Sequence, residues 1–226
     1  MRGATMVAGA PLALPAHALR KLAERRLEAR CRETRSLVLT YDDGPGRSLT
    51  PALLEVLADR GARATFFALG RRALEAPEVL DRVAAAGHEV GCHSFDHRNA
   101  WKVPPAAGVA DIDEGYESLA RWVRPDGLFR PPYGKLTLAT WAALRRRRGR
   151  LACWTVVSGD TFGELPRQED VVDQVVRGGG GVVLMHDFDR EPERGEYVTG
   201  LTGRLLDAAE RHGLTPATLG DVLDRG

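Results

Sequence analysis

The chain has 226 residues, and its 32 Lys and Arg residues against 31 Asp and Glu residues give a formal net charge of +1. This balance argues against a basic nucleic-acid-binding protein, and the 43% hydrophobic and 28% charged residues exclude a disordered or collagen-like chain. A chain of this length buries about 70% of the surface that it exposes when unfolded, so one domain is expected and any bound metal should have a functional role.

Residues 4–18 are apolar and small, and they end in an Ala-His-Ala sequence of the kind found at cleavage sites. Pro11 and Pro15 interrupt this stretch and only Arg2 precedes it, so a signal or anchor and a simple lead-in both stay open. No run of about 18 apolar residues occurs, which predicts that the chain has no membrane-spanning helix. We expect a cytoplasmic location, with secretion or peripheral membrane attachment as the alternative if residues 1–18 act as a signal.

Residues 16–32 have the pattern of a basic amphipathic helix, in which Leu19, Leu22 and Leu27 alternate with charged residues. This helix precedes the first predicted strand, and we interpret it as an appendage to the domain that follows. We therefore interpret residues 1–33 as an N-terminal extension and residues 34–226 as the main domain.

From residue 36 onward, short apolar runs alternate with helical patterns. The predicted strands cover residues 36–40, 64–69, 88–91, 128–130, 151–156 and 181–185. The predicted helices cover residues 49–60, 77–86, 109–123, 138–148, 169–176 and 202–212. This alternation is typical of an α/β protein with a parallel sheet, either open or closed into a barrel, in which ligands bind at the carboxyl ends of the strands.

The three cysteines, Cys31, Cys92 and Cys153, are odd in number and lack the CxxC spacing. Neither a disulfide framework nor a thiolate zinc cluster is indicated, so we expect buried thiols. Cys92 directly precedes His93, which leaves a thiolate metal ligand as a minor alternative.

Acidic and imidazole side chains follow two of the predicted strands. Asp42 and Asp43 come after the first strand, where Asp-Asp-Gly taken alone is also typical of an acidic turn. His93 and His97 follow the strand over residues 88–91. On a helical turn, two histidines four residues apart project from one face and can share a divalent cation, although a pair of exposed histidines explains the spacing equally well.

Two neutral imidazoles and one carboxylate would form a three-ligand site with a position left for water, which is typical of a catalytic metal. Asp43 is a candidate for the carboxylate, which would leave Asp42 free as a base. This ligand set suits Zn, Co, Ni or Mn, and we expect zinc.

Two further clusters follow later strands. Arg130 comes at the end of a predicted strand, where Pro131 and Pro132 form a rigid turn before Tyr133; a surface turn with a packed tyrosine is the plain alternative. His186 follows the apolar run over residues 181–185 and is a candidate proton donor, because the usual pKa of histidine, about 6.5, suits proton exchange near neutrality.

The order and spacing of these clusters resemble the polysaccharide deacetylase family, carbohydrate esterase family 4. The segments that carry the resemblance are Thr40-Tyr41-Asp42-Asp43-Gly44-Pro45, His93-Ser94-Phe95-Asp96-His97, Arg130-Pro131-Pro132-Tyr133-Gly134 and Leu184-Met185-His186-Asp187. The similarity extends over about residues 36–223. It implies a distorted (β/α) barrel of about seven parallel strands and a metal-dependent hydrolase that removes acetyl groups from N-acetylated or O-acetylated sugars.

The resemblance also implies roles for individual residues at the metal. Asp43, His93 and His97 would bind the ion. Asp42 would be the general base that takes a proton from the attacking water, and Arg130 would orient it.

On the other side of the scissile bond, the resemblance implies that His186 protonates the leaving group. The backbone N–H of Tyr133 would face the oxyanion, Leu184 would line the pocket for the acetyl methyl group, and Pro131 would belong to the substrate-binding turn. Asp160 would orient His186.

The fourth motif departs from the family pattern. Members usually have two acids three residues apart followed by an aromatic residue, whereas this chain has Val157 in place of the first acid and Thr161 in place of the aromatic residue. The second acid is retained as Asp160. The departure puts the shape of the sugar subsite in doubt more than the metal chemistry.

The expected partner is an acetylated saccharide, and the oligomeric state is not predicted. Two alternatives stay open at this point. One is an amidase that acts on cyclic amides or ureides in a similar barrel, and the other is a family member that binds a saccharide without turnover.

Overall fold

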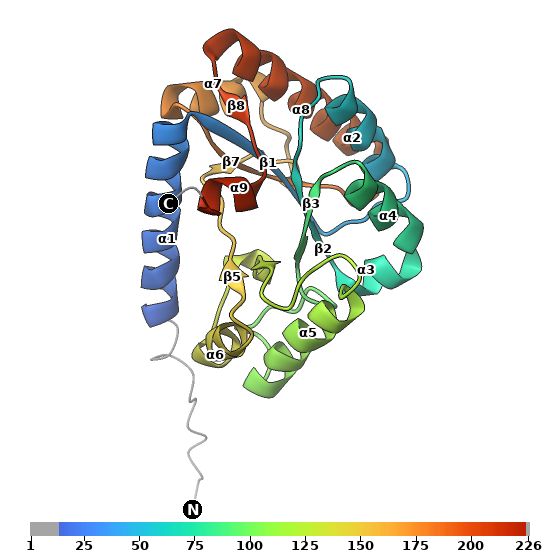
Figure 1. Cartoon of the computed structure of the whole chain (residues 1–226), viewed down its shortest axis with the longest axis vertical. Helices are drawn as coiled ribbons and strands as arrows, with labels where there is room; N and C mark the ends of the chain where they lie inside the picture. Colours follow the sequence, from blue (N-terminus) through green and yellow to red (C-terminus); the bar gives the residue numbers. More distant parts are fainter. Residues whose placement is uncertain (1–13, 225–226) are drawn as a thin grey trace, which may run out of the picture.

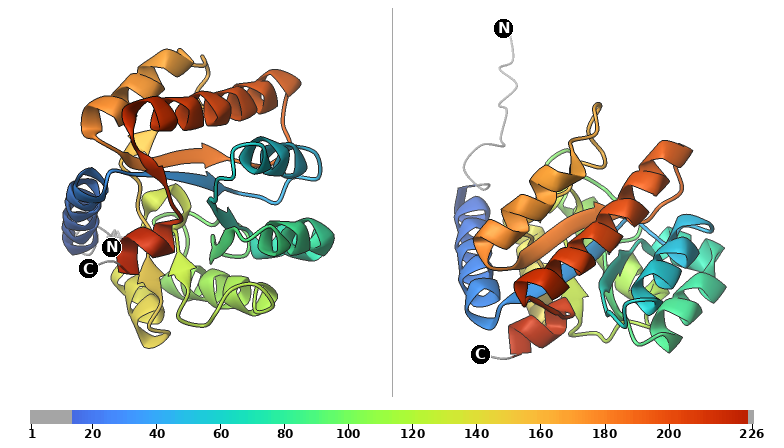
Figure 2. Two further views of the ribbon diagram at one scale, coloured as in Figure 1. Left: turned by 45° about the horizontal axis from the view of Figure 1, so that its top comes forward. Right: turned by 90° about the horizontal axis from the view of Figure 1, so that it is seen from above.

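The computed structural model describes residues 14–224, with side chains from residue 20 onward. Its strands form one sheet in the order β5-β4-β3-β2-β1-β7-β6, and the short β8 pairs with β1. Every pairing is parallel. Figures 1 and 2 show the sheet curling into a half-barrel with helices around it. The prediction of a single α/β domain, a distorted barrel of about seven parallel strands, is confirmed.

The strands are β1 (Ser36–Asp42), β2 (Thr65–Ala68), β3 (Glu89–Cys92), β4 (Leu128–Phe129), β5 (Arg150–Leu151), β6 (Val156–Val157), β7 (Gly181–His186) and β8 (Thr215–Pro216). The helices are α1 (Leu14–Thr34), α2 (Leu49–Ala58), α3 (Gly70–Glu75), α4 (Pro77–Ala85), α5 (Pro105–Ser118), α6 (Leu138–Arg146), α7 (Gln168–Gly178), α8 (Pro192–His212) and α9 (Leu219–Asp224), and a 3₁₀ turn covers Pro132–Gly134.

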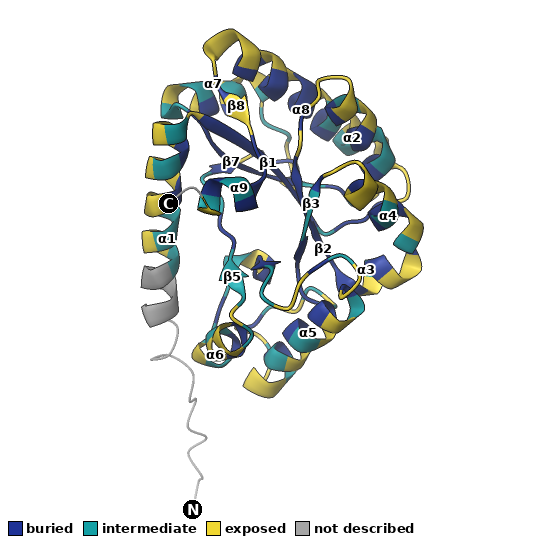
Figure 3. Cartoon of the chain, in the orientation of Figure 1, coloured by how far each residue is buried: buried dark blue, intermediate teal, exposed yellow. Residues whose placement is uncertain are grey.

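The central strand β1 is apolar because it is covered on both faces, and all seven of its residues are buried. Successive side chains of a strand point to opposite faces. Leu37, Leu39 and Tyr41 belong to the core under the outer helices. Val38 belongs to a second cluster, which α1 and α9 cover. Val38 and Asp42 are four residues apart, so their side chains point to the same face of β1. At the carboxyl end of the strand, this face carries Asp42. Figure 3 shows the buried strands inside the layer of helices.

One predicted strand, over residues 151–156, is two strands in the structure. Its first part pairs with β4, where the N–H of Ala152 donates to the carbonyl of Phe129 at 2.8 Å. Its last part pairs with β7, where the N–H of Thr155 donates to the carbonyl of Val182 at 2.9 Å. The segment therefore crosses between the two edges of the curled sheet. A link of four residues spans at most about 18 Å, which requires the edges to approach each other.

The bounds of several other helices and strands differ from the predicted ones, because the sequence signals for their ends are weak. The helix predicted over residues 202–212 begins at Pro192, where the fixed φ of proline suits the first helical turn. Glycines at 195, 200 and 203 obscure its periodicity in the sequence. The helix predicted over residues 109–123 is α5, which begins and ends earlier. The short elements α3, α9 and β8 were not predicted, because two to six residues carry too little periodicity.

The predicted N-terminal helix is present as α1, and its Leu27 and Cys31 are buried in the second cluster. Figure 1 shows α1 alongside α9. The division between residues 33 and 34 stays a prediction. The signal or anchor considered for residues 1–18 lies mainly outside the described residues. Within residues 14–224, no helix is long and apolar enough to cross a membrane.

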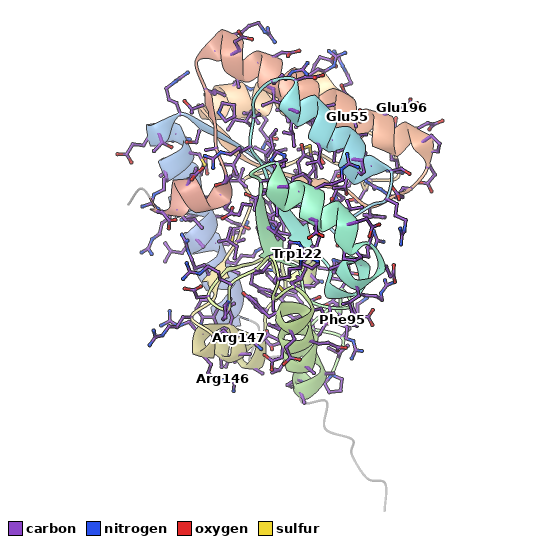
Figure 4. The ribbon with its side chains drawn as sticks, turned by 45° about the vertical axis from the view of Figure 1, so that its right-hand side comes forward. Glu55, Phe95, Trp122, Arg146, Arg147 and Glu196 are labelled. Carbon is purple, nitrogen blue, oxygen red and sulfur yellow. The ribbon has the colours of Figure 1, made fainter. Side chains whose placement is uncertain are left out.

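The end of α6 lies far from the strand carboxyl ends, because α6 leads directly into the start of β5. Figure 4 shows Arg146 and Arg147 there, while Glu55 and Glu196 lie at the other end of the view on α2 and α8. Arg147 forms an ion pair with Asp113 at 2.9 Å. These two arginines therefore lie at a helix terminus, away from the carboxyl ends of the strands.

Candidate active site

Polar side chains gather at the carboxyl ends of neighbouring strands. β1 ends at Asp42 and β7 at His186, and the parallel register sets these two residues side by side. His93 directly follows β3, and Arg130 directly follows β4. The sheet contacts continue there, since the N–H of Arg130 donates to the carbonyl of Cys92 at 3.0 Å. The sheet thus brings residues that lie far apart in the chain to one edge.

Asp43, His93 and His97 bring candidate metal-ligating atoms together, all within 4.8 Å of one another. Nε2 of each imidazole lies 3.3 Å from Oδ1 of Asp43. That oxygen is buried and has no hydrogen-bond partner among the described residues. A buried carboxylate oxygen without a donor is costly, and a divalent cation between it and two imidazoles would satisfy it.

The two histidines do not lie on a helical turn, and that expectation was wrong. They belong to the loop after β3, in which Ser94 (φ 72°) and His97 (φ 58°) adopt the left-handed conformation. Asp111 of α5 holds this loop. Its Oδ1 accepts from the N–H of Asp96 at 2.7 Å, and its Oδ2 accepts from the N–H of Arg98 at 3.1 Å. The loop, and not helical periodicity, brings the imidazoles together.

The partners of the imidazoles set their protonation. His93 Nδ1 donates to the carbonyl of Arg130 at 2.7 Å, so Nε2 of the neutral ring is the free ligand atom. Burial lowers the pKa of His93, but the charges of Asp42 and Asp43 outweigh burial and raise that pKa above its usual value. Burial opposes ionisation of Asp43, yet His93 and His97 hold its pKa below the usual range. Burial and the charge of His93 lower the pKa of His97.

Asp42 is held by a fully buried guanidinium. Arg130 is 0% exposed and donates to Oδ1 of Asp42 at 2.7 Å. It also donates to Oγ1 of Thr40 at 2.8 Å and to the carbonyl of Cys153 at 3.0 Å, in the segment that crosses between the sheet edges. Its Cζ lies 4.1 Å from the centre of the Phe67 ring. Arg130 therefore links Asp42 to the closure of the sheet, and it contacts the carboxylate that it was expected to orient.

Asp160 contacts His186 from the loop after β6. His186 Nδ1 donates to Oδ1 of Asp160 at 3.0 Å, and Ser158 donates to the same oxygen at 2.7 Å. Burial lowers the pKa of His186, but hydrogen bonding and charge from Asp160 raise it above the usual value. Burial raises the pKa of Asp160, and His186, Ser158 and Arg190 together lower it.

The sequence contained no signal for two arginines that support this pair. Arg190 donates to Oδ2 of Asp160 at 2.7 Å, and Arg194 donates to its backbone carbonyl at 2.6 Å. Arg190 precedes α8 and Arg194 lies in its first turn, a region that the sequence does not predict as helical. Asp111 of α5 carries no local signal either, because its contacts depend on how α5 packs against the loop after β3.

A second buried acid, Asp187, lies beside the paired residues. Burial raises its pKa to about 7, and Thr50 donates to its Oδ2 at 2.6 Å. A Cβ at Gly44 would overlap the Asp187 carboxylate, so only glycine fits there. The Gly44 position thus lets the chain after Asp43 pass close to Asp187.

The remaining predicted residues lie around the paired groups. Tyr133 is 57% exposed, and its ring centre is 4.5 Å from that of His97. Its backbone is left-handed, with φ 55°. Pro131 is buried at the start of the turn, and Leu184 is buried in β7 two residues before His186.

The altered fourth motif leaves apolar side chains exposed. Val157 is 43% exposed and Phe162 is 55% exposed, while Thr161 is also at the surface. Cys92 lies in the core, and burial raises the pKa of its thiol to about 12. Its thiol is not among the grouped ligand atoms of Asp43, His93 and His97, so the described residues give a thiolate ligand no support.

The fold and the site define an α/β-barrel protein whose carboxylate, imidazole and guanidinium groups converge at the carboxyl ends of its strands, the position of active sites in barrel enzymes. A family model described as polysaccharide deacetylase matches residues 29–148. The chain belongs to the polysaccharide deacetylase family, carbohydrate esterase family 4.

Named relatives agree with this assignment. The chain is 29% identical over 189 residues to a peptidoglycan-N-acetylglucosamine deacetylase of Bacillus cereus, covering 83% of this chain and 87% of the relative. It is 32% identical over 159 residues to a chitooligosaccharide deacetylase of Azorhizobium caulinodans, covering 67% and 73%. A family 4 carbohydrate esterase from Streptomyces lividans, solved in complex with acetate, has a TM-score of 0.70 and 28% identity, covering 80% of this chain and 91% of that one.

Proposed function

We propose that this protein is a metal-dependent deacetylase that removes the acetyl group from N-acetylated saccharides. The observation that carries the proposal is the buried, unpartnered Oδ1 of Asp43, with Nε2 of both His93 and His97 at 3.3 Å. This cluster adjoins the ion-paired Asp42, and the Asp160–His186 pair lies at the end of the neighbouring strand β7.

Asp43, His93 and His97 are the residues that would hold the cation. The hydrogen bond from His93 Nδ1 to the Arg130 carbonyl keeps Nε2 available, which is how protein partners fix the tautomer of a ligating imidazole. A divalent cation bound there would polarise the acetyl carbonyl and lower the pKa of water. The three donors, one carboxylate and two imidazoles, suit Zn, Co, Ni or Mn, and we propose zinc.

The side chains around this cluster divide the proton transfers between them. Asp42 takes a proton from the attacking water, and the hydrogen bond from Arg130 orients its carboxylate. His186 gives a proton to the departing amine, and Asp160 holds its imidazole in the required tautomer. The backbone N–H of Tyr133 faces the developing oxyanion, and Leu184 and Pro131 bound the acetyl pocket.

The substrate class follows from the relatives. Those of Bacillus cereus and Azorhizobium caulinodans are named for peptidoglycan N-acetylglucosamine and chitooligosaccharide, which are both N-acetylglucosamine saccharides. We assign the same class to this chain. The exposed Val157 and Phe162 lie where the fourth motif departs from the family, so they are the residues expected to shape the sugar subsite.

Removal of metal should abolish the activity, because the proposed carbonyl polarisation needs a cation. We expect no acetate release from N-acetylglucosamine oligomers or peptidoglycan fragments after chelation, and recovery on addition of Zn, Co, Ni or Mn. Asp43→Ala should weaken zinc binding by at least about 100-fold, since loss of a mere hydrogen-bonding neighbour of a ligand already costs 10–100-fold. Isothermal titration calorimetry measures the zinc affinity, and an enzymatic acetate assay measures the release of acetate.

Exposed Asp59, at the end of α2, supplies the control variant Asp59→Asn, which should bind zinc and release acetate as the wild type does. Acetate release that survives chelation would overturn the metal requirement. Zinc binding with no acetate release, accompanied by hydrolysis of cyclic amides or ureides, would favour the ring amidase. Zinc binding with saccharide binding and no hydrolysis would favour a non-catalytic member.

The pH dependence should report on the Asp160–His186 pair. The proposed acid must be protonated, so activity is present below the pKa of His186 and is lost as pH rises through it. Asp160 raises that pKa above its usual 6.5. Asp160→Asn removes the charge and should move the basic limb of the kcat/KM profile to lower pH by about one unit or more. The profile of Asp59→Asn should coincide with that of the wild type. An unmoved or raised basic limb in Asp160→Asn would contradict the assignment.

A further inference from the structure

α1 contacts the turn that holds the proposed oxyanion donor. Nη1 of Arg20 donates to the carbonyl of Gly134 at 3.4 Å. Gly134 is left-handed, with φ 64°, and a Cβ there would overlap the Arg20 guanidinium. The guanidinium is thus packed against the backbone immediately after Tyr133. The family model begins at residue 29, so this contact comes from outside the matched region.

The same arginine packs on an indole that also touches the buried arginine of the site. Cζ of Arg20 lies 5.6 Å from the centre of the Trp154 ring, and Cζ of Arg130 lies 5.6 Å from the same centre. A Cβ at Gly134 would come within 2.8 Å of the Trp154 ring. Arg20, Gly134 and Trp154 therefore form one packed cluster, and Arg130 connects it to Asp42 at 2.7 Å.

Arg20 is itself held in place. Its side chain is 21% exposed, and its Nε lies 3.2 Å from Oε1 of Glu24, one turn further along α1. The helix is anchored by Leu27 and Cys31, which are buried against the sheet. The guanidinium is therefore presented to the turn by a packed helix and not by a free terminal segment.

The turn needs such support because Tyr133 adopts φ 55°, a conformation that costs a non-glycine residue about 1 kcal/mol or more. Within the turn, the N–H of Gly134 donates to the Pro131 carbonyl at 2.8 Å, and the N–H of Lys135 donates to the Pro132 carbonyl at 3.0 Å. Arg20 holds the carbonyl of Gly134, two residues after Pro132.

We infer that Arg20 is a positioning residue: it fixes the Pro131–Gly134 turn so that the Tyr133 N–H meets the oxyanion, an inference that rests on the proposed deacetylase activity. It touches neither substrate nor metal in this role. Because the oxyanion develops only in the transition state, a displaced donor lowers kcat and leaves substrate binding intact.

Steady-state kinetics of Arg20→Ala test the inference. We expect kcat to fall about 10-fold with KM within about 2-fold of the wild type, because small displacements of a positioned group are costly in the transition state alone. Arg20→Lys should recover to within about 3-fold, since an ammonium can still reach the Gly134 carbonyl. The matched control is Arg25→Ala, an exposed arginine of the same helix, which should behave as the wild type.

Hydrogen–deuterium exchange gives a readout that does not need activity. In Arg20→Ala, the amides of Gly134 and Lys135 should exchange faster than in the wild type and in Arg25→Ala, at equal thermal stability. Unchanged exchange and kcat would overturn the inference, as would a kcat loss that only follows a loss of folded protein. If the wild type releases no acetate, the proposed function fails, while the exchange rates still decide whether Arg20 holds the turn.

Discussion

Asp42→Asn should lower kcat for acetate release by about 10³-fold with little change in KM, within the range that loss of a general base costs. The asparagine keeps the shape of the side chain and one oxygen that can accept from Arg130, so the site stays assembled. What it lacks is the ability to take a proton. An acetate assay under saturating substrate and zinc measures the effect.

The control for this variant is again Asp59→Asn, which removes an exposed carboxylate at the end of α2, where the chain leads to the start of β2. Zinc affinity should be nearly unchanged in Asp42→Asn, because the candidate ligands are Asp43, His93 and His97. A kcat within a few-fold of the wild type, with zinc bound, would show that Asp42 is not the base.

Arg130→Met should destabilise the protein by about 3–5 kcal/mol, the usual cost of leaving one member of a buried ion pair without its partner. Arg130 is fully buried, and its removal takes away the donor at 2.7 Å from the buried Asp42. The substitution also removes the hydrogen bonds that Arg130 donates to Oγ1 of Thr40 and to the carbonyl of Cys153. Urea unfolding followed by circular dichroism gives the free energy of unfolding.

The double variant Asp42→Leu/Arg130→Met distinguishes the cost of an unpaired buried charge from the cost of lost side-chain packing. Replacement of a buried ion pair by apolar side chains is often neutral or stabilising, so the double variant should regain most of the stability that Arg130→Met loses. Neither variant should release acetate. If the free energy of unfolding falls equally in the single and double variants, the unpaired Asp42 carboxylate is not the cause of the destabilisation.

The strand ends could be predicted from the sequence because their signals are local. Apolar runs alternate with helical periods, and Asp42, Asp43, His93 and His186 each lie within three residues of the end of such a run. In a parallel sheet these positions meet at one edge, whatever the exact curvature. The clustering of the candidate ligands therefore followed from order and spacing.

The supporting contacts could not be predicted, because they join elements whose separation depends on packing. Asp111 reaches the histidine loop from α5, Arg190 reaches Asp160 from the segment before α8, and Arg20 reaches the Pro131–Gly134 turn from α1. Nothing in the neighbourhood of these residues in the sequence marks them. The helical-turn interpretation of His93 and His97 failed for the same reason, since α5 holds their loop in a left-handed conformation.

The sequence by itself determined the α/β class, the family and the chemical groups available at the strand ends, since each depends on residue identity and short-range period. Only the tertiary structure decided that residues 151–156 cross between the two edges of the sheet, and that this crossing seats Arg130 against Asp42. The physical reason is that hydrophobic period is encoded over a few residues, whereas the curl of a sheet is the sum of twist and packing over all its strands.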